Sequence, residues 1–292
     1  MKTILVLTDF SPNADYAAHY ALKIAQSIKA NLLLCNIYEL PQGPRISDRN
    51  AWPLEACEKN SIEDLGKLAA RLKSEINQCP HIHFRPEVNQ CSLAGSVIDR
   101  INEVAGKYNI LMAVISKHSA GILSTMLSGN HTKDIIEEAE FPVMVIPPQA
   151  KFNGFKKISF ATDLAHNGMD ILHSLYGITK YFDSEILITH VAADRSMEIE
   201  KEHITKYFFN QETAPPHYPK IYYRAIQNKS VIAGLDWVAE HTDIDLMVLV
   251  HRKRNIFQKI FEESVTQKLA ISLAKPLLIF PFSKVSESLP VF

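Results

Sequence analysis

The sequence predicts an α/β protein made of two tandem doubly wound, Rossmann-like domains, each with a five-stranded parallel sheet. Three observations predict this fold class. The chain has 292 residues, a length typical of two domains. Its two halves repeat each other's strand patterns, and in each half short apolar runs alternate with helical patterns. Nearly continuous apolar strands separated by helices are typical of a parallel sheet that is covered on both faces.

The internal repeat appears when the sequence is shifted against itself. It consists of four pairs of strand patterns: 4–9 with 158–163, 32–37 with 186–191, 111–115 with 245–249, and 141–146 with 275–280. The shift is 154 residues for the first two pairs and 134 for the last two, so the first copy has about 20 extra residues in its middle. We expect these at Leu40–Trp52, a polar, proline-containing excursion over the surface.

The repeat also predicts the domain boundaries. Two prolines, Pro147 and Pro148, follow the last strand of the first copy and end it. The first domain is therefore expected to span residues 1–150 and the second residues 151–292.

Composition argues against several classes of protein. The formal net charge of −1 provides no general attraction to nucleic acid or to anionic membrane. The longest apolar runs are far too short to span a bilayer, and the first residues lack the long apolar region of a secretory signal. The sequence therefore predicts a cytoplasmic protein without a nucleic-acid or membrane partner.

The cysteines and histidines give no pattern typical of a redox or metal site. The four cysteines are Cys35, Cys57, Cys79 and Cys91. They form no CxxC pair, and we expect packed thiols. His81 and His83 would share one face of a predicted strand, but the spacing offers no third ligand, so no metal site is predicted.

Ligands of open parallel sheets bind beyond the carboxyl ends of the strands, where the strand order reverses. In the first copy, the ends of strands 1, 2 and 4 are expected at this edge. Strand 1 is expected to end at Thr8-Asp9, and Ser11 after it is a candidate N-cap for the next helix. Asp9 is either a ligand contact or a turn residue, and its place at a strand end favours the contact. Strand 2 is expected to end at Asn36-Ile37.

Strand 4 is expected to end within Ser116–Ser119, and a polar loop follows it. The loop leads to Gly129-Asn130 and to a predicted helix at Thr132–Glu138. The unpaired N–H groups and the positive dipole end of a helix N-terminus suit a phosphate group.

Three features together carry a family resemblance: Asp9 after strand 1, the spacing Ser116-x2-Ser119-x9-Gly129-Asn130, and a last strand opened by Pro142. With them the chain resembles the universal stress protein family in its tandem two-domain form. The family pattern after strand 4 is Gly-x2-Gly-x9-Gly-Ser/Thr. Here serine replaces two glycines and Asn130 replaces the hydroxyl residue. Serine resists the positive φ that glycine accepts.

The resemblance implies a stress-response or regulatory protein that binds ATP or AMP in the first domain, with or without Mg²⁺, and is not an enzyme; slow ATP hydrolysis stays open. Asp9 would lie near the ribose or base, and Ile37 would supply backbone contacts to adenine. The implied nucleotide contacts are Thr8, Asp9, Ile37, Ser116, Ser119, Gly129, Asn130 and Thr132. The alternative is a nucleotide-independent interaction or scaffold module. It would act through a protein partner or a homo-oligomer, with the two last strands paired as an internal pseudo-dimer.

The second copy departs further from the family pattern. Its strand 4 runs into a basic segment, residues 251–254, and Glu263 stands where a phosphate-binding glycine is expected. A carboxylate at that position opposes anion binding. A solvated loop is the favoured interpretation of the basic segment, over a grip on an anion. We therefore expect a degenerate second site at Asp163, Val191, Arg252, Lys253 and Ser264.

Overall fold

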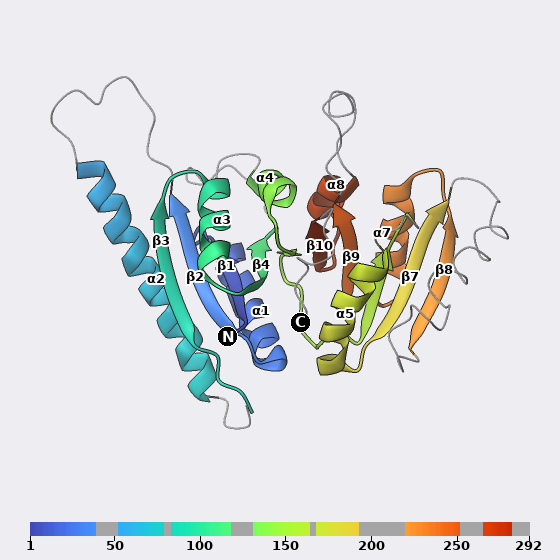
Figure 1. Ribbon diagram of the computed structural model, residues 1–292, viewed down its shortest axis with the longest axis horizontal. Helices are drawn as coiled ribbons and strands as arrows, with labels where there is room; N and C mark the ends of the chain where they lie inside the picture. Colours follow the sequence, from blue (N-terminus) through green and yellow to red (C-terminus); the bar gives the residue numbers. More distant parts are fainter. Residues whose placement is uncertain are drawn as a thin grey trace, which may run out of the picture. The chain divides into compact units, whose positions relative to one another are not determined.

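The computed structural model describes residues 1–38, 52–78, 83–117, 131–163, 168–192, 220–251 and 265–281. The chain divides into two compact units, Met1–Gln149 (unit 1) and Ala150–Phe292 (unit 2). Each unit contains five strands that are parallel to one another and its own helices (Figure 1).

Unit 1 alternates strands and helices along the chain. Its elements are β1 (Thr3–Leu7), α1 (Pro12–Ile28), β2 (Asn31–Tyr38), α2 (Trp52–Gln78), β3 (Val88–Ala94), α3 (Val97–Lys107), β4 (Ile110–Ser116), α4 (His131–Glu138) and β5 (Val143–Ile146). The strand order is β3-β2-β1-β4-β5, and each neighbouring pair is parallel. The order reverses between β1 and β4, which is where this architecture places its ligands.

Unit 2 repeats this topology. Its elements are β6 (Lys157–Ala161), α5 (Gly168–Phe182), β7 (Glu185–Ala192), β8 (Ile221–Gln227), α7 (Val231–His241), β9 (Leu246–His251), α8 (Val265–Ser272) and β10 (Leu277–Pro281). The order β8-β7-β6-β9-β10 matches that of unit 1, again with parallel pairs. The predicted tandem doubly wound fold is confirmed.

The central strands of unit 1 form its core. β2 and β4 are buried along their whole length, and helix α1 covers β1 and β4 with a stripe of small residues. These residues are Ala14, Ala17, Ala18, Ala21 and Ala25, and all five are buried. α1 contacts α2, and α3 contacts α4. With right-handed crossovers, the reversal in strand order places these two helix pairs on opposite faces of the sheet.

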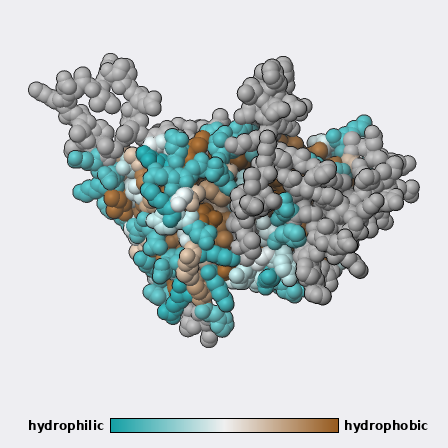
Figure 2. Space-filling view, in the orientation of Figure 1, coloured by the Kyte–Doolittle hydropathy of each residue, from teal (hydrophilic) through white to brown (hydrophobic). Residues whose placement is uncertain are grey.

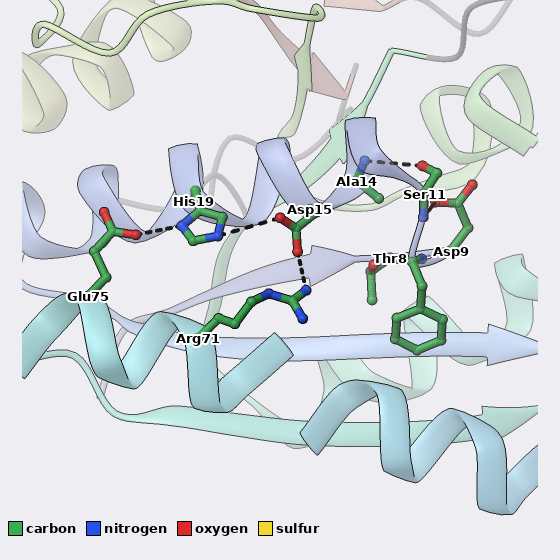
Figure 3. A network of polar contacts seen from close by, with 9 residues as sticks. Thr8, Asp9, Ser11, Ala14, Asp15, His19, Arg71 and Glu75 are labelled. Carbon is green, nitrogen blue, oxygen red and sulfur yellow. Dashed lines mark hydrogen bonds and ion pairs between the residues drawn. The ribbon is translucent and has the colours of Figure 1, made fainter. Parts of the chain in front are cut away.

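A polar network joins α1 to α2 at the surface of unit 1 (Figure 3). Nδ1 of His19 lies 2.5 Å from Oε2 of Glu75, and Asp15 pairs with both Arg71 and His19. These side chains are about one third to one half exposed, so each pair contributes at most about 1 kcal/mol. The network therefore orients the two helices more than it stabilises them.

Three local expectations need correction. β2 continues to Tyr38, one residue beyond its predicted end. Trp52 is the first residue of α2 and not the end of a surface excursion, while residues 39–51 lie outside the described part. His83 lies in a bend before β3 and not in a strand, because β3 starts only at Val88; His81 is outside the described residues.

The visible face of the described residues is mainly hydrophilic, with apolar side chains in small groups (Figure 2). Within the described ranges, no helix combines the length and the apolar character needed to cross a membrane.

Candidate functional site

The first part of the candidate site is the junction between the ends of β1 and β2. The backbone N–H of Thr8 donates to the carbonyl oxygen of Cys35 at 3.0 Å, which continues the parallel ladder. The side-chain Nδ2 of Asn36 donates to the carbonyl oxygen of Thr8 at 2.7 Å, and this bond is buried. The two strand ends are therefore held together by both main chain and side chain.

The turn from β1 into α1 is ordered by its own side chains (Figure 3). Phe10 takes φ 60° and donates its N–H to Oγ1 of Thr8 at 3.0 Å. Oδ1 of Asp9 accepts the N–H of Ser11 at 3.0 Å, and Oγ of Ser11 accepts the N–H of Ala14 at 3.2 Å. Ser11 is the N-cap of α1, as predicted. Asp9 therefore stabilises the turn through its carboxylate. A ligand contact through the same carboxylate would be a second role.

The predicted contacts on neighbouring strands lie at the same sheet edge. Ile37 is buried near the end of β2, and Ser116 is the buried last residue of β4. The next residue, Lys117, donates its N–H to the carbonyl oxygen of Ile146 at the end of β5, at 2.8 Å. Since the carboxyl ends of parallel strands meet at one edge, these positions lie on the side to which Thr8 and Asp9 belong.

The phosphate part of the predicted site is only partly within the described chain. Thr132 lies in the first turn of α4 and is half-buried, so the predicted helix is present. The loop residues Ser119, Gly129 and Asn130 lie outside the described residues.

Sequence reasoning missed the end of β3, which also reaches this edge. Gly95 follows β3 with φ 130° and donates its N–H to the carbonyl oxygen of Tyr38 at 3.0 Å. A Cβ atom at this glycine would lie 3.1 Å from Nε of Arg100, which itself donates to the carbonyl oxygen of Ala94 at 2.9 Å. The sequence contained a signal for this turn, because Gly95-Ser96 directly precedes an amphipathic helix pattern.

Tyr38 is the only phenol among these strand ends that the structure describes. Burial raises the pKa of its hydroxyl, and Glu58 and Cys57 on α2 raise it further. The phenol therefore stays protonated at neutral pH and can act as a hydrogen-bond donor near the edge.

The corresponding edge of unit 2 repeats the frame with different side chains. The N–H of Thr162 donates to the carbonyl oxygen of Thr189 at 3.0 Å. Nδ1 of His190 lies 2.9 Å from the carbonyl oxygen of Thr162, and because a carbonyl oxygen only accepts, Nδ1 is the donor. His190 therefore takes the role that Asn36 has in unit 1.

Two other predicted second-site residues directly follow the bonded residues of this frame, Asp163 after Thr162 and Val191 after His190. Asp163 is exposed, and Val191 is half-buried at the end of β7, where its side chain packs against Gly234 of α7. Arg252, Lys253 and Ser264 lie outside the described residues. Among described residues of both units, no group of three acidic, histidine or cysteine side chains is arranged to hold a metal ion.

Comparison with known proteins adds to this geometry. The sequence profile of the universal stress protein family matches residues 1–147, half of the chain. No curated protein gives a significant sequence match.

Solved structures share the fold across almost the whole chain. A universal stress protein from Archaeoglobus fulgidus DSM 4304 is 14% identical with a TM-score of 0.73, covering 96% of this chain and 98% of that one. A functionally unknown protein from Pseudomonas aeruginosa PAO1 is 15% identical with a TM-score of 0.58, covering 98% and 95%. The cytoplasmic domain of a prokaryotic cation chloride cotransporter is 9% identical with a TM-score of 0.51, covering 95% and 93%. At these identities, the similarity establishes the fold alone.

Proposed function

Because the chain belongs to the universal stress protein family, we propose that unit 1 binds ATP or AMP at the carboxyl edge of its sheet and serves as a regulatory protein through that binding. The observation that carries this proposal is the joined end of β1 and β2. Asn36 and Cys35 fix Thr8 in place, so Asp9 and Ile37 are presented on a rigid frame before any ligand arrives.

The proposed roles follow the residue positions. Asp9 lies next to the ribose or base, and the backbone at Ile37 contacts adenine. The phosphates lie over the α4 N-terminus, where the dipole favours negative charge. The residues on the phosphate side are Thr8, Ser116, Ser119, Gly129, Asn130 and Thr132.

Mg²⁺ fits this proposal only as a companion of the phosphates. It prefers carboxylate, phosphate and water oxygens in an octahedral shell. Asp9 is the one carboxylate among the proposed contacts, and it already accepts a turn hydrogen bond. Any Mg²⁺ at this edge would therefore arrive with ATP and keep most of its water.

Unit 2 is proposed to have lost this function. Asp163 occupies the position of Asp9 in the repeat, but it is exposed. The carbonyl of the preceding residue, Thr162, is held by His190, where Asn36 holds that of Thr8 in unit 1. We infer one nucleotide per chain.

The test is ATP and AMP affinity by isothermal titration calorimetry. Asp9→Asn keeps an oxygen for the N–H of Ser11 while it removes the charge, so it separates ligand contact from turn stability. We expect Asp9→Asn to weaken binding about tenfold, the scale of one lost charged hydrogen bond. The matched control Asp163→Asn should leave affinity and stoichiometry unchanged. Absence of binding at millimolar ATP, or equal effects of both variants, would overturn the proposal.

A nucleotide-independent interaction module is the second candidate, and one observation on unit 2 favours it. Tyr222 on β8 is 51% exposed and Trp237 on α7 is 39% exposed, with the guanidinium of Arg224 over the Trp237 ring at 5.3 Å. Aromatic and arginine side chains are enriched where proteins bind each other. If Trp237→Ala abolishes a self-association that nucleotide does not affect, this candidate replaces the first.

A further inference from the structure

Two cysteines that are far apart in the sequence face each other in the sheet of unit 1. Cys35 on β2 and Cys91 on β3 are register partners in a parallel pair. Neighbouring strands lie about 4.8 Å apart and register partners direct their side chains to the same face. A disulfide needs Cα atoms about 4.4–6.8 Å apart, so the backbone already has the required spacing. Both cysteines are free thiols in the structure.

The face on which the two thiols lie follows from their neighbours. Oγ of Ser92 donates to Oγ of Ser61 on α2 at 2.7 Å, so Ser92 points to the α2 side of the sheet. Successive residues of a strand alternate in direction, so Cys91 points to the opposite side. There it faces Lys107 and Glu103 of α3, whose charges act on its thiol.

The two thiols differ in reactivity. A hydrogen bond from the thiol of Cys35, together with the charge of Lys107, lowers the pKa of Cys91 to about 7 against the opposing effects of burial and Glu103. The same contact and full burial raise the pKa of Cys35. Cys91 is half-buried on β3, the outermost strand in the order of unit 1, whereas Cys35 is buried. Cys91 is thus the accessible thiolate and Cys35 the protected thiol beside it.

We propose that Cys35 and Cys91 form a peroxide-sensitive dithiol, in which Cys91 is oxidised first and Cys35 resolves it as an intramolecular disulfide. The proposal goes beyond nucleotide binding and does not depend on it.

The chemistry balances with hydrogen peroxide as the oxidant. The Cys91 thiolate attacks one peroxide oxygen, the O–O bond breaks, and hydroxide leaves and is protonated to water. Cys91 is then a sulfenic acid. Cys35 loses its proton and attacks this sulfur, the S–O bond breaks, and the leaving hydroxide takes up a proton as a second water. Two thiols and one peroxide give one disulfide and two waters.

The disulfide would tie β3 to β2 directly beside the candidate site. The carbonyl of Cys35 accepts the N–H of Thr8, and its neighbour Asn36 holds the carbonyl of Thr8. Oxidation would therefore covalently extend the frame that holds the end of β1.

The experiment treats the full-length protein with hydrogen peroxide, blocks remaining thiols with N-ethylmaleimide and maps peptides by mass spectrometry. We expect loss of two of the four thiols and a peptide joining Cys35 to Cys91. Cys57→Ser is the matched control, since Cys57 is a half-buried thiol on α2, and it should keep the disulfide. Cys35→Ala should stop at a sulfenic acid on Cys91 that dimedone captures.

A second measurement uses the wild-type protein and does not require that the core variant Cys35→Ala folds. At pH 7, iodoacetamide should alkylate Cys91 several-fold faster than Cys57, because the contact with Cys35 and the charge of Lys107 favour the thiolate form of Cys91. Cys91→Ser should retain its three thiols under the same peroxide treatment. The proposal is overturned by four retained thiols in the wild type, by a disulfide that involves Cys57 or Cys79, or by equal alkylation rates.

Discussion

The two units build the same sheet edge with different side chains. In unit 1 a buried asparagine, Asn36, holds the carbonyl of Thr8, and in unit 2 a half-buried histidine, His190, holds that of Thr162. A side-chain N–H donor and the position of its carbonyl acceptor are kept, while the donor changes from an amide to an imidazole. The hydrogen bond is therefore a requirement of the frame, and the chemistry around it is free to differ.

The turn that follows the third strand shows the same contrast. Unit 1 uses one glycine, Gly95, at φ 130°, with the side chain of Arg100 beneath it. Unit 2 has two residues, Asn228 and Lys229, between β8 and the N-cap Ser230. Oδ1 of Asn228 accepts the N–H of Ser230 at 2.9 Å. At the position of Arg100 the second unit has Gly234, which lets α7 approach Val191 closely. In unit 1 the guanidinium of Arg100 therefore occupies the space between helix and strand end, and in unit 2 the backbone of α7 at Gly234 lies close to the strand end itself.

The largest effect is expected from breaking the bond at the β1 end. Asn36→Ala leaves the buried carbonyl of Thr8 without its donor and should lower the free energy of unfolding by about 1–3 kcal/mol. His190→Ala should cost less, because water can reach the half-buried carbonyl partner in unit 2. Hydrogen exchange read by mass spectrometry assigns each loss to its unit. Equal losses of unfolding free energy in the two variants would show that burial does not make the Asn36 bond stronger than the His190 bond.

A smaller effect is expected where α7 meets β7. In Gly234→Ala the new Cβ would lie 2.7 Å from Cγ1 of Val191, so the valine side chain or the helix must shift. Overpacking of about 1–3 kcal/mol, offset by about 1 kcal/mol of helix propensity, should leave unit 2 destabilised in calorimetry. Gly66→Ala in α2 is the control, since nothing lies within 4 Å of its Cβ, and it should stabilise unit 1. A stabilising Gly234→Ala would contradict the close approach.

The smallest effect concerns the caps of the matched helices α3 and α7. Ser230 accepts the N–H of Ala233 at 3.3 Å, whereas Ser96 makes no side-chain cap bond. Ser230→Ala should therefore cost about 1 kcal/mol and Ser96→Ala at most about 0.5 kcal/mol in thermal unfolding. The reverse order would mean that Ser96 caps its helix in solution.

The fold could be predicted because repeats and apolar periodicity are properties of the sequence itself. The strand patterns of both copies lie in strands, and the helix expected at Thr132–Glu138 is α4. The sequence analysis made no helix prediction between β2 and β3, although Leu65, Leu68, Leu72 and Ile76 recur there at helical spacing and are buried. The long helix α2 begins at Trp52, at the edge of a segment expected to be a loop.

The candidate site was predictable only where it follows a strand end directly. The N-cap role of Ser11 and the turn role of Asp9, one of its two interpretations, follow from their position after β1, and the ligand contact of Asp9 stays a prediction. The pairing of Cys35 with Cys91 was missed, because register between strands is set by three-dimensional packing and leaves no spacing motif.

The joined ends of β1 and β2 also determine how unit 1 can open. The amide of Thr8 is bonded to β2, and its carbonyl is held by a side chain of the same strand. A local opening that exposes Thr8 must therefore break both bonds to β2, while β2 itself stays paired with β3. We therefore expect the end of β1 to open in one cooperative step in hydrogen exchange, and a ligand that holds Thr8 against β2 should slow that step.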